Sequence, residues 1–171
     1  LKSLIKFSKL KKSPISINMI ISNNPRSKGL EFGKTYKIKK KVFDFRNMLL
    51  VEKKILIELK KNKINLICLA GFMKILSKNF IKNFDGKILN IHPSLLPKYK
   101  GLNTHERVIK NKDKYSGCTV HFVNEKLDSG KIIGQKKVKI NKSDTPQTLA
   151  KKILIQEHKL YPEAILKIFS L

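Results

Sequence analysis

Residues 64–71, with the sequence INLICLAG, form an almost unbroken apolar run that closes on glycine. Such a run is typical of a β-strand that is covered on both faces, as in a parallel sheet between helices. A second strand is predicted at residues 86–91, GKILNI, and an amphipathic helix at residues 46–62. Strands and helices that alternate at these lengths predict an α/β fold, with a largely parallel central sheet flanked by helices.

The remaining segments continue the alternation. Further strands are predicted at residues 14–22, 118–123 and 131–140, with a short edge strand within residues 34–43. Further helices are predicted at residues 1–12, just before Gly33, at 77–84, at 104–111 and at 143–169. Ser77 and Thr104 are the predicted caps of the third and fourth of these helices, and Pro162 is expected to break the last one. The apolar side of the 46–62 helix is predicted to carry Leu49, Ile55, Leu56 and Leu59.

The size and composition of the chain indicate one soluble globular domain, residues 1–171. A chain of this length buries about two-thirds of its unfolded surface. No apolar run approaches the roughly 18 residues that a bilayer-spanning helix needs, so no membrane partner is expected. Cys68 and Cys118 both lie in apolar strand-like segments. We interpret them as buried thiols in a reducing compartment, which favours the cytoplasm.

The formal net charge of +26 suggests a nucleic-acid ligand at first sight. However, nearly all of the charge is lysine, and the only arginines are Arg26, Arg46 and Arg107. The lysines are spread from Lys2 to Lys167 instead of forming one block. Lysine, isoleucine and asparagine share A/T-rich codons, so a biased genome explains the same profile. We therefore expect no specific nucleic-acid partner.

Chemically interesting residues gather in the loops that follow three predicted strands, at residues 70–76, 90–97 and 124–130. In α/β sheets, ligands bind beyond the carboxyl ends of the strands. Asn90 and His92 are two positions apart, so they point to the same side of their strand. An amide and an imidazole aimed at one point make a candidate clamp for a carbonyl or an oxyanion.

A histidine that acts as a cationic acid needs a carboxylate nearby to hold its charge. Asp128, in the loop after TVHFV, could supply that carboxylate. His121 alternates within a strand and is interpreted as a core or supporting residue. His105 and His158 lie in predicted helices, and with the cysteines they show no metal-ligand spacing, so no metal is expected.

Four segments carry a resemblance to a known family. They are LAGFMKILS at 69–77, NIHPSLLPKYKGLNTHERVI at 90–109, GCTVHFVNEKLDSGKII at 117–133 and QEHKLYP at 156–162. Together they resemble the phosphoribosylglycinamide formyltransferases, folate-dependent enzymes of purine synthesis with a Rossmann-like fold. NIHPSLLP marks the wider formyl-transfer superfamily, and the continuation YKGLNTHE is similar to this family's version.

The resemblance implies an activity and a set of catalytic residues. The formyl group of N10-formyltetrahydrofolate, the co-substrate, would pass to the amine of glycinamide ribonucleotide without a metal. By matching motifs, Asn90 would bind the formyl oxygen and His92 would be the protonated acid. Asp128 would hold the charge of His92 and order a relay water. These three residues are the expected catalytic set.

The resemblance also assigns binding residues. Besides Asn90, the residues expected to bind the folate are Arg46, Met73, Lys74, Ile75 and Leu76, and residues 124–128 would close on its other side. Pro93 and Glu157 are expected near the ribonucleotide, with Glu157 at its sugar hydroxyls. The family often has other residues in place of Lys74, Lys100 and Lys131, but none of these departures falls on the expected catalytic set.

The family begins with a strand and a Gly-x-Gly-Ser-Asn loop that binds the substrate phosphate on backbone N–H groups. Residues 1–7 resemble the helix directly after that loop, so we expect the chain to be incomplete at its N-terminus and inactive by itself. Two alternatives remain open: an enzyme that formylates initiator tRNA, and a non-catalytic remnant that binds folate or nucleic acid. The enzyme is expected to be a monomer or a homodimer.

Overall fold

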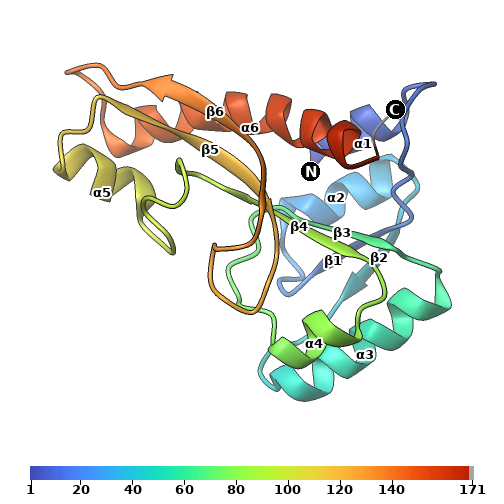
Figure 1. Cartoon of the computed structure of the whole chain (residues 1–171). Coiled ribbons are helices and arrows are strands. Elements are labelled where there is room, and N and C mark those ends of the chain that lie inside the picture. Colours follow the sequence, from blue (N-terminus) through green and yellow to red (C-terminus); the bar gives the residue numbers. More distant parts are fainter. Residues whose placement is uncertain (170–171) are drawn as a thin grey trace.

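The computed structural model describes residues 1–169 and confirms the alternation of helices and strands (Figure 1). The helices are α1 (Lys2–Ser8), α2 (Lys28–Thr35), α3 (Met48–Lys61), α4 (Lys78–Asn83), α5 (Thr104–Lys110) and α6 (Pro146–Phe169). The strands are β1 (Met19–Ser22), β2 (Lys39–Val42), β3 (Leu66–Leu69), β4 (Lys87–His92), β5 (Tyr115–Phe122) and β6 (Ile132–Lys139).

The strands form two sheets. β1 and β2 pair in parallel, and a four-stranded sheet has the order β3-β4-β5-β6. β3 and β4 are parallel, whereas β5 runs antiparallel to both β4 and β6. The α/β class with parallel strands between helices is confirmed. β5 and β6 are joined by a loop without a crossover helix, so these two neighbouring strands run in opposite directions. β5 also runs antiparallel to β4, although α5 lies between them in the chain.

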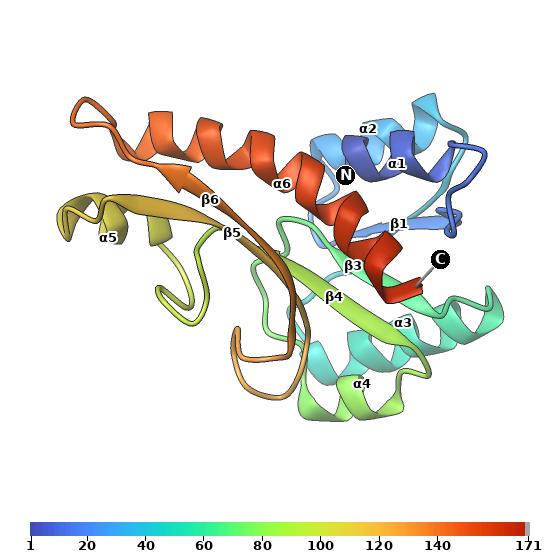
Figure 2. The same cartoon turned by 45° about the horizontal axis from the view of Figure 1, so that its top comes forward.

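Helices cover both faces of the four-stranded sheet (Figures 1 and 2). Alternate residues of β4 face opposite layers, as strand geometry requires. Ile88 packs in a cluster with residues of α3 and α4, and Leu89 packs in a cluster with residues of α1 and α6. Asn90 and His92 follow Ile88 at intervals of two and share its face. They therefore lie on the α3–α4 side, at the point where β4 ends.

Two details of the helices differ from the sequence prediction, and one agrees with it. α6 continues through Pro162 to Phe169, because buried residues on both sides of the proline pack it against the sheet. Leu49 is 64% exposed, since the buried stripe of α3 instead follows Val51, Ile55 and Leu59 at intervals of four. Ser77 caps α4 as predicted, accepting a hydrogen bond from the Phe80 amide.

The N-cap of α5 is not the predicted Thr104. Asn103 occupies that position in the left-handed conformation, with φ 56°, and Thr104 is the buried first residue of the helix. Asparagine tolerates the left-handed region better than β-branched threonine does, which accounts for the shift by one residue.

Both cysteines are free, Cys118 fully buried and Cys68 half-buried. Burial raises the pKa of Cys68 to about 11 and that of Cys118 to about 12, so both stay thiols at neutral pH. Within residues 1–169, no helix is both long and apolar enough to cross a bilayer.

Candidate active site

The proline-containing loop after β4 is tied to the sheet by side chains of β5 and β6. The Thr119 hydroxyl donates to the Ser94 carbonyl at 2.6 Å and accepts from the Leu96 amide at 3.1 Å. The Gln135 amide donates to the Leu96 carbonyl at 2.9 Å. Since prolines supply no backbone N–H, these side chains replace the backbone hydrogen bonds that regular structure would provide. The loop thereby holds the end of β4 in a fixed position.

His92, 5% exposed at the end of β4, has a hydrogen-bond acceptor at each ring nitrogen. Nε2 lies 2.8 Å from the Tyr99 carbonyl oxygen, and Nδ1 lies 3.4 Å from Asp128 Oδ2. A neutral imidazole can donate from only one nitrogen, whereas an imidazolium donates from both. Both ring nitrogens of His92 therefore face an oxygen atom.

Asp128 is itself fixed by the backbone. It is 9% exposed, and its Oδ2 accepts a hydrogen bond from the Gly101 amide at 2.8 Å. Asp128 has φ 45° and Gly101 has φ 77°, both in the left-handed region. Gly101 has no Cβ to resist that conformation, and aspartate is among the residues that tolerate it best. Residues 99–101 therefore contact both members of the His92–Asp128 pair.

His121 stands directly opposite Asn90 in the antiparallel pairing of β4 with β5. Its Nδ1 donates to the Phe122 carbonyl at 2.8 Å, so in the neutral ring Nε2 is left as an acceptor. The Asn90 amide nitrogen lies 3.4 Å from that Nε2. His121 thus orients the Asn90 side chain through one N–H and leaves the second N–H for a ligand.

The other two histidines nearby favour the neutral form. Burial lowers the pKa of His121, and the nearby charge of His92 adds to the shift, although Asp128 opposes it. Burial and the charge of His92 also lower the pKa of half-buried His105. His121 and His105 are therefore suited to act as neutral hydrogen-bond partners.

The loop between β3 and α4 leaves the sheet beside Asn90, since Leu69 at the end of β3 pairs with Asn90. Within the loop, Met73 is 73% exposed and Ile75 is 65% exposed, and Lys74 is exposed as well. Leu76 differs from them, because its side chain is buried in the cluster with α3 and α4. A ligand at this loop could contact the side chains of the exposed residues, but of Leu76 it could contact only backbone groups.

A buried carboxylate that the sequence analysis did not single out anchors this loop. Glu52 of α3 is 3% exposed and accepts hydrogen bonds from Ser77, at 2.8 Å from the amide and 2.5 Å from the hydroxyl. On the other side, Lys78 forms a 2.8 Å ion pair with Glu125 of the β5–β6 loop. The loop at 70–77 is therefore tied to α3, and the start of α4 that follows it is tied to the loop at 124–130.

Arg46 is an exposed side chain that pairs with Asp44. Its neighbour Phe45 packs edge-on against Phe72 at 5.6 Å between ring centroids, which places the Arg46 segment beside the loop at 70–77. Besides Asn90, the expected folate residues thus come from two adjoining segments.

The two expected ribonucleotide residues come from different parts of the chain. Pro93 directly follows His92 and is half-buried. Glu157 lies on α6, half-buried, and burial raises the pKa of its carboxyl group. α6 packs against β5 and β6, so Glu157 belongs to the layer that covers that face of the sheet.

Across residues 1–169, no cluster of three or more histidine, cysteine, aspartate or glutamate side chains could hold a metal ion. The site instead presents an oriented amide, an imidazole that is hydrogen-bonded to the Tyr99 carbonyl and paired with Asp128, and a fixed carboxylate. Such a set can bind a carbonyl oxygen, stabilise negative charge that develops on it, and transfer protons.

This acid–amide cluster at the end of a parallel strand fits a group-transfer enzyme acting on a carbonyl, and comparison with known proteins gives the family. The formyl transferase family model matches residues 1–165, so the chain belongs to the formyl transferase family. Within it, the chain is similar to phosphoribosylglycinamide formyltransferase of Haemophilus influenzae, 44% identical over 155 residues that cover 89% of this chain and 73% of the relative.

Two further relatives show how the match extends. The crystal structure of phosphoribosylglycinamide formyltransferase from Bacillus halodurans is 34% identical, with a TM-score of 0.93 over 99% of this chain and 89% of that one. The human trifunctional purine biosynthetic protein adenosine-3 is 39% identical over 168 residues, which are 96% of this chain. The chain spans 17% of the length of that trifunctional protein.

Proposed function

We propose that this chain transfers the formyl group of N10-formyltetrahydrofolate to the amine of glycinamide ribonucleotide, a step of purine synthesis. The observation that carries the proposal is that Asn90, His92 and Asp128 belong to one hydrogen-bonded and ion-paired cluster at the end of β4, in a chain of this family. Asn90 is oriented by His121, and His92 contacts Asp128 at 3.4 Å. The proposed setting is the cytoplasm, and the proposed partners are these two small molecules.

In the proposed reaction, the amine nitrogen attacks the formyl carbon and forms a new C–N bond, while the carbonyl electron pair moves to oxygen. The free N–H of Asn90 and the imidazolium of His92 stabilise the oxyanion. The attacking nitrogen then loses a proton, the bond between the formyl carbon and N10 breaks, and N10 gains a proton. His92 exchanges protons in these steps, and Asp128 keeps its ring oriented and charged.

We propose separate binding residues for the folate and for the ribonucleotide. The folate would lie between the loop at 70–77, with Met73, Lys74, Ile75 and the backbone of Leu76, and the loop at 124–128. Arg46 adjoins the first of these loops and would face the anionic tail of the folate. Pro93 and Glu157 are proposed for the ribonucleotide. The ion pair between Lys78 and Glu125 supports the idea that the two loops act together.

An enzyme assay with two acceptors tests the proposal. The protein expressed from its full gene would be given N10-formyltetrahydrofolate with either glycinamide ribonucleotide or initiator methionyl-tRNA, and the formylated product would be identified by mass spectrometry. Formylated glycinamide ribonucleotide is the expected product. Formylated methionyl-tRNA, or no product from either acceptor, would contradict the proposal.

The net charge of +26 is the observation that favours the tRNA alternative. We propose instead that RNA binds weakly and without selectivity, because such binding rests on counterion release and falls steeply with salt. A titration at near-physiological salt with tRNA and with a random RNA of equal length separates the two. Equal and weak binding supports the purine enzyme, whereas tight binding selective for tRNA supports the alternative.

A further inference from the structure

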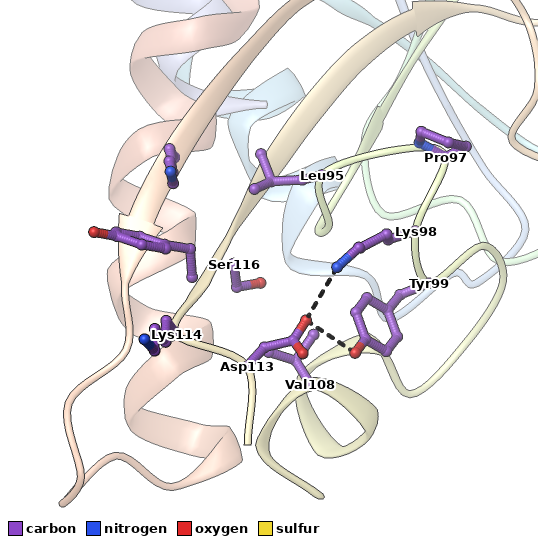
Figure 3. A pocket seen from close by; sticks show the side chains of 10 residues that line it. Leu95, Pro97, Lys98, Tyr99, Val108, Asp113, Lys114 and Ser116 are labelled. Carbon is purple, nitrogen blue, oxygen red and sulfur yellow. Dashed lines mark hydrogen bonds and ion pairs between the residues drawn. The ribbon is translucent and has the colours of Figure 1, made fainter. Parts of the chain in front are cut away.

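A hollow of about 450 Å³ lies beside the loop that carries Tyr99, separate from the proposed catalytic residues (Figure 3). Its lining includes Leu95, Tyr99, Asp113, Ser116 and Lys137. Tyr99 takes part in both places, because its carbonyl faces His92 while its hydroxyl faces Asp113.

The charge of the lining is positive. Lys98, Lys114 and Lys137 contribute three cations against the single carboxylate of Asp113. That carboxylate already has partners, since the Tyr99 hydroxyl donates to it at 3.0 Å and Lys98 lies 3.9 Å from it. Lys137 sits 3.7 Å above the ring of Tyr115, which holds its ammonium group at the wall of the hollow. The lining therefore favours an anion over a cation.

A buried hydroxyl in the wall lacks a partner. Ser116 is 2% exposed, and within residues 1–169 its Oγ has no hydrogen-bond partner. Figure 3 shows its side chain between those of Leu95 and Asp113. A buried hydroxyl without a partner is unfavourable. A ligand oxygen that accepts a hydrogen bond from Ser116 would therefore make binding more favourable.

The rest of the lining is mostly apolar and limits the shape of the ligand that can fit. Leu95, Pro97, Val108 and the Tyr115 ring contribute hydrocarbon surface to the lining. Pockets that combine such walls with a few polar groups suit small organic molecules.

We propose that this hollow binds a small organic phosphate, with its anionic group at the lysines and Ser116 and its apolar body against Leu95 and Val108. The site is distinct from the substrate site, and its existence does not depend on the reaction that the enzyme catalyses. Phenyl phosphate is a suitable probe, because it joins a phosphate to one aromatic ring.

Calorimetric titration with phenyl phosphate tests the proposal. Ser116→Ala and Lys137→Gln should each weaken binding by about threefold to tenfold, the size of one hydrogen bond or one charge contact. Lys54→Gln, which removes an exposed lysine on α3, should leave the affinity unchanged. Inorganic phosphate should bind more weakly than phenyl phosphate, and phenol should not bind detectably.

Thermal melting shows whether the variants fold, and Ser116→Ala should be at least as stable as the wild type because it removes an unpaired hydroxyl. His92→Asn should bind phenyl phosphate as the wild type does. The proposal is overturned if Lys54→Gln weakens binding as much as Lys137→Gln does, which would show general attraction to a basic surface. It is also overturned if His92→Asn abolishes binding, or if folded Ser116→Ala and Lys137→Gln proteins keep full affinity.

Discussion

Asp128 Oδ2 lies 3.4 Å from His92 Nδ1 and accepts a hydrogen bond from the Gly101 amide at 2.8 Å. One carboxylate oxygen of Asp128 therefore contacts both the His92 imidazole and the backbone of the loop that follows His92. Since both side chains are buried, water does little to screen their interaction. The pair can keep its geometry while a substrate enters and leaves.

Replacing Asp128 with asparagine should lower kcat by about 100-fold or more, the size of a general acid–base contribution. The amide keeps the shape of the carboxylate but removes the negative charge that favours a protonated His92. Steady-state kinetics should show KM for both substrates changed far less than kcat. Asp85→Asn, at an exposed position, is the matched control and should retain full activity. An Asp128→Asn enzyme with near-normal kcat would remove Asp128 from the mechanism.

Replacing His121 with phenylalanine should reduce kcat by about tenfold to 100-fold, because a misoriented catalytic group can cost that much. An aromatic ring is kept, although a larger one, and the acceptor for the Asn90 amide is lost. Folate binding, measured by fluorescence with an analogue, should change little. If kcat of His121→Phe equals that of the wild type in a folded protein, Asn90 does not need this hydrogen bond.

Replacing Ser77 with alanine should destabilise the protein by about 2 kcal/mol, since a helix cap is lost and the buried Glu52 carboxylate loses a donor. Ser27→Ala is the matched control, because Ser27 is the N-cap of α2 but its side chain makes no capping hydrogen bond. Urea unfolding of the two variants gives the comparison. Equal losses in both would mean that the contact of Ser77 with Glu52 contributes nothing.

Replacing Glu157 with glutamine should stabilise the protein near pH 7 and have little effect near pH 4. Burial raises the pKa of Glu157 in the folded state, so the folded protein binds its proton more tightly than the unfolded chain does. Stability is then lost as pH rises through the ordinary carboxyl range and the raised pKa. Thermal melting at the two pH values measures the effect. A glutamine variant that is less stable than the wild type at pH 7 would contradict it.

The sequence predicted the part of the site that depends on local geometry. Asn90 and His92 share a face because strand residues alternate, and the structure places them so at the end of β4. The Asp128 loop was expected beside them from the resemblance, and its 3.4 Å approach to His92 agrees with that expectation.

The contacts that sequence reasoning missed join residues far apart in the chain. The Tyr99 carbonyl and the Gly101 amide act through the backbone, so residue type gives little sign of them, although the glycine was a signal of a left-handed turn. In the sequence, Glu52 is one of several charged residues on a helix. Its burial against Ser77 results from the packing of α3 against α4, which the sequence pattern does not show. The antiparallel course of β5 was missed because short alternating strands do not reveal their direction.

The central claim is that His92 serves as the acid in formyl transfer. A single-turnover assay with labelled N10-formyltetrahydrofolate and glycinamide ribonucleotide measures the chemical step directly, for the wild type and for His92→Asn. We expect the variant to transfer the formyl group about 100-fold to 10,000-fold more slowly, with substrate affinities close to those of the wild type. Transfer by His92→Asn at the wild-type rate would contradict the account.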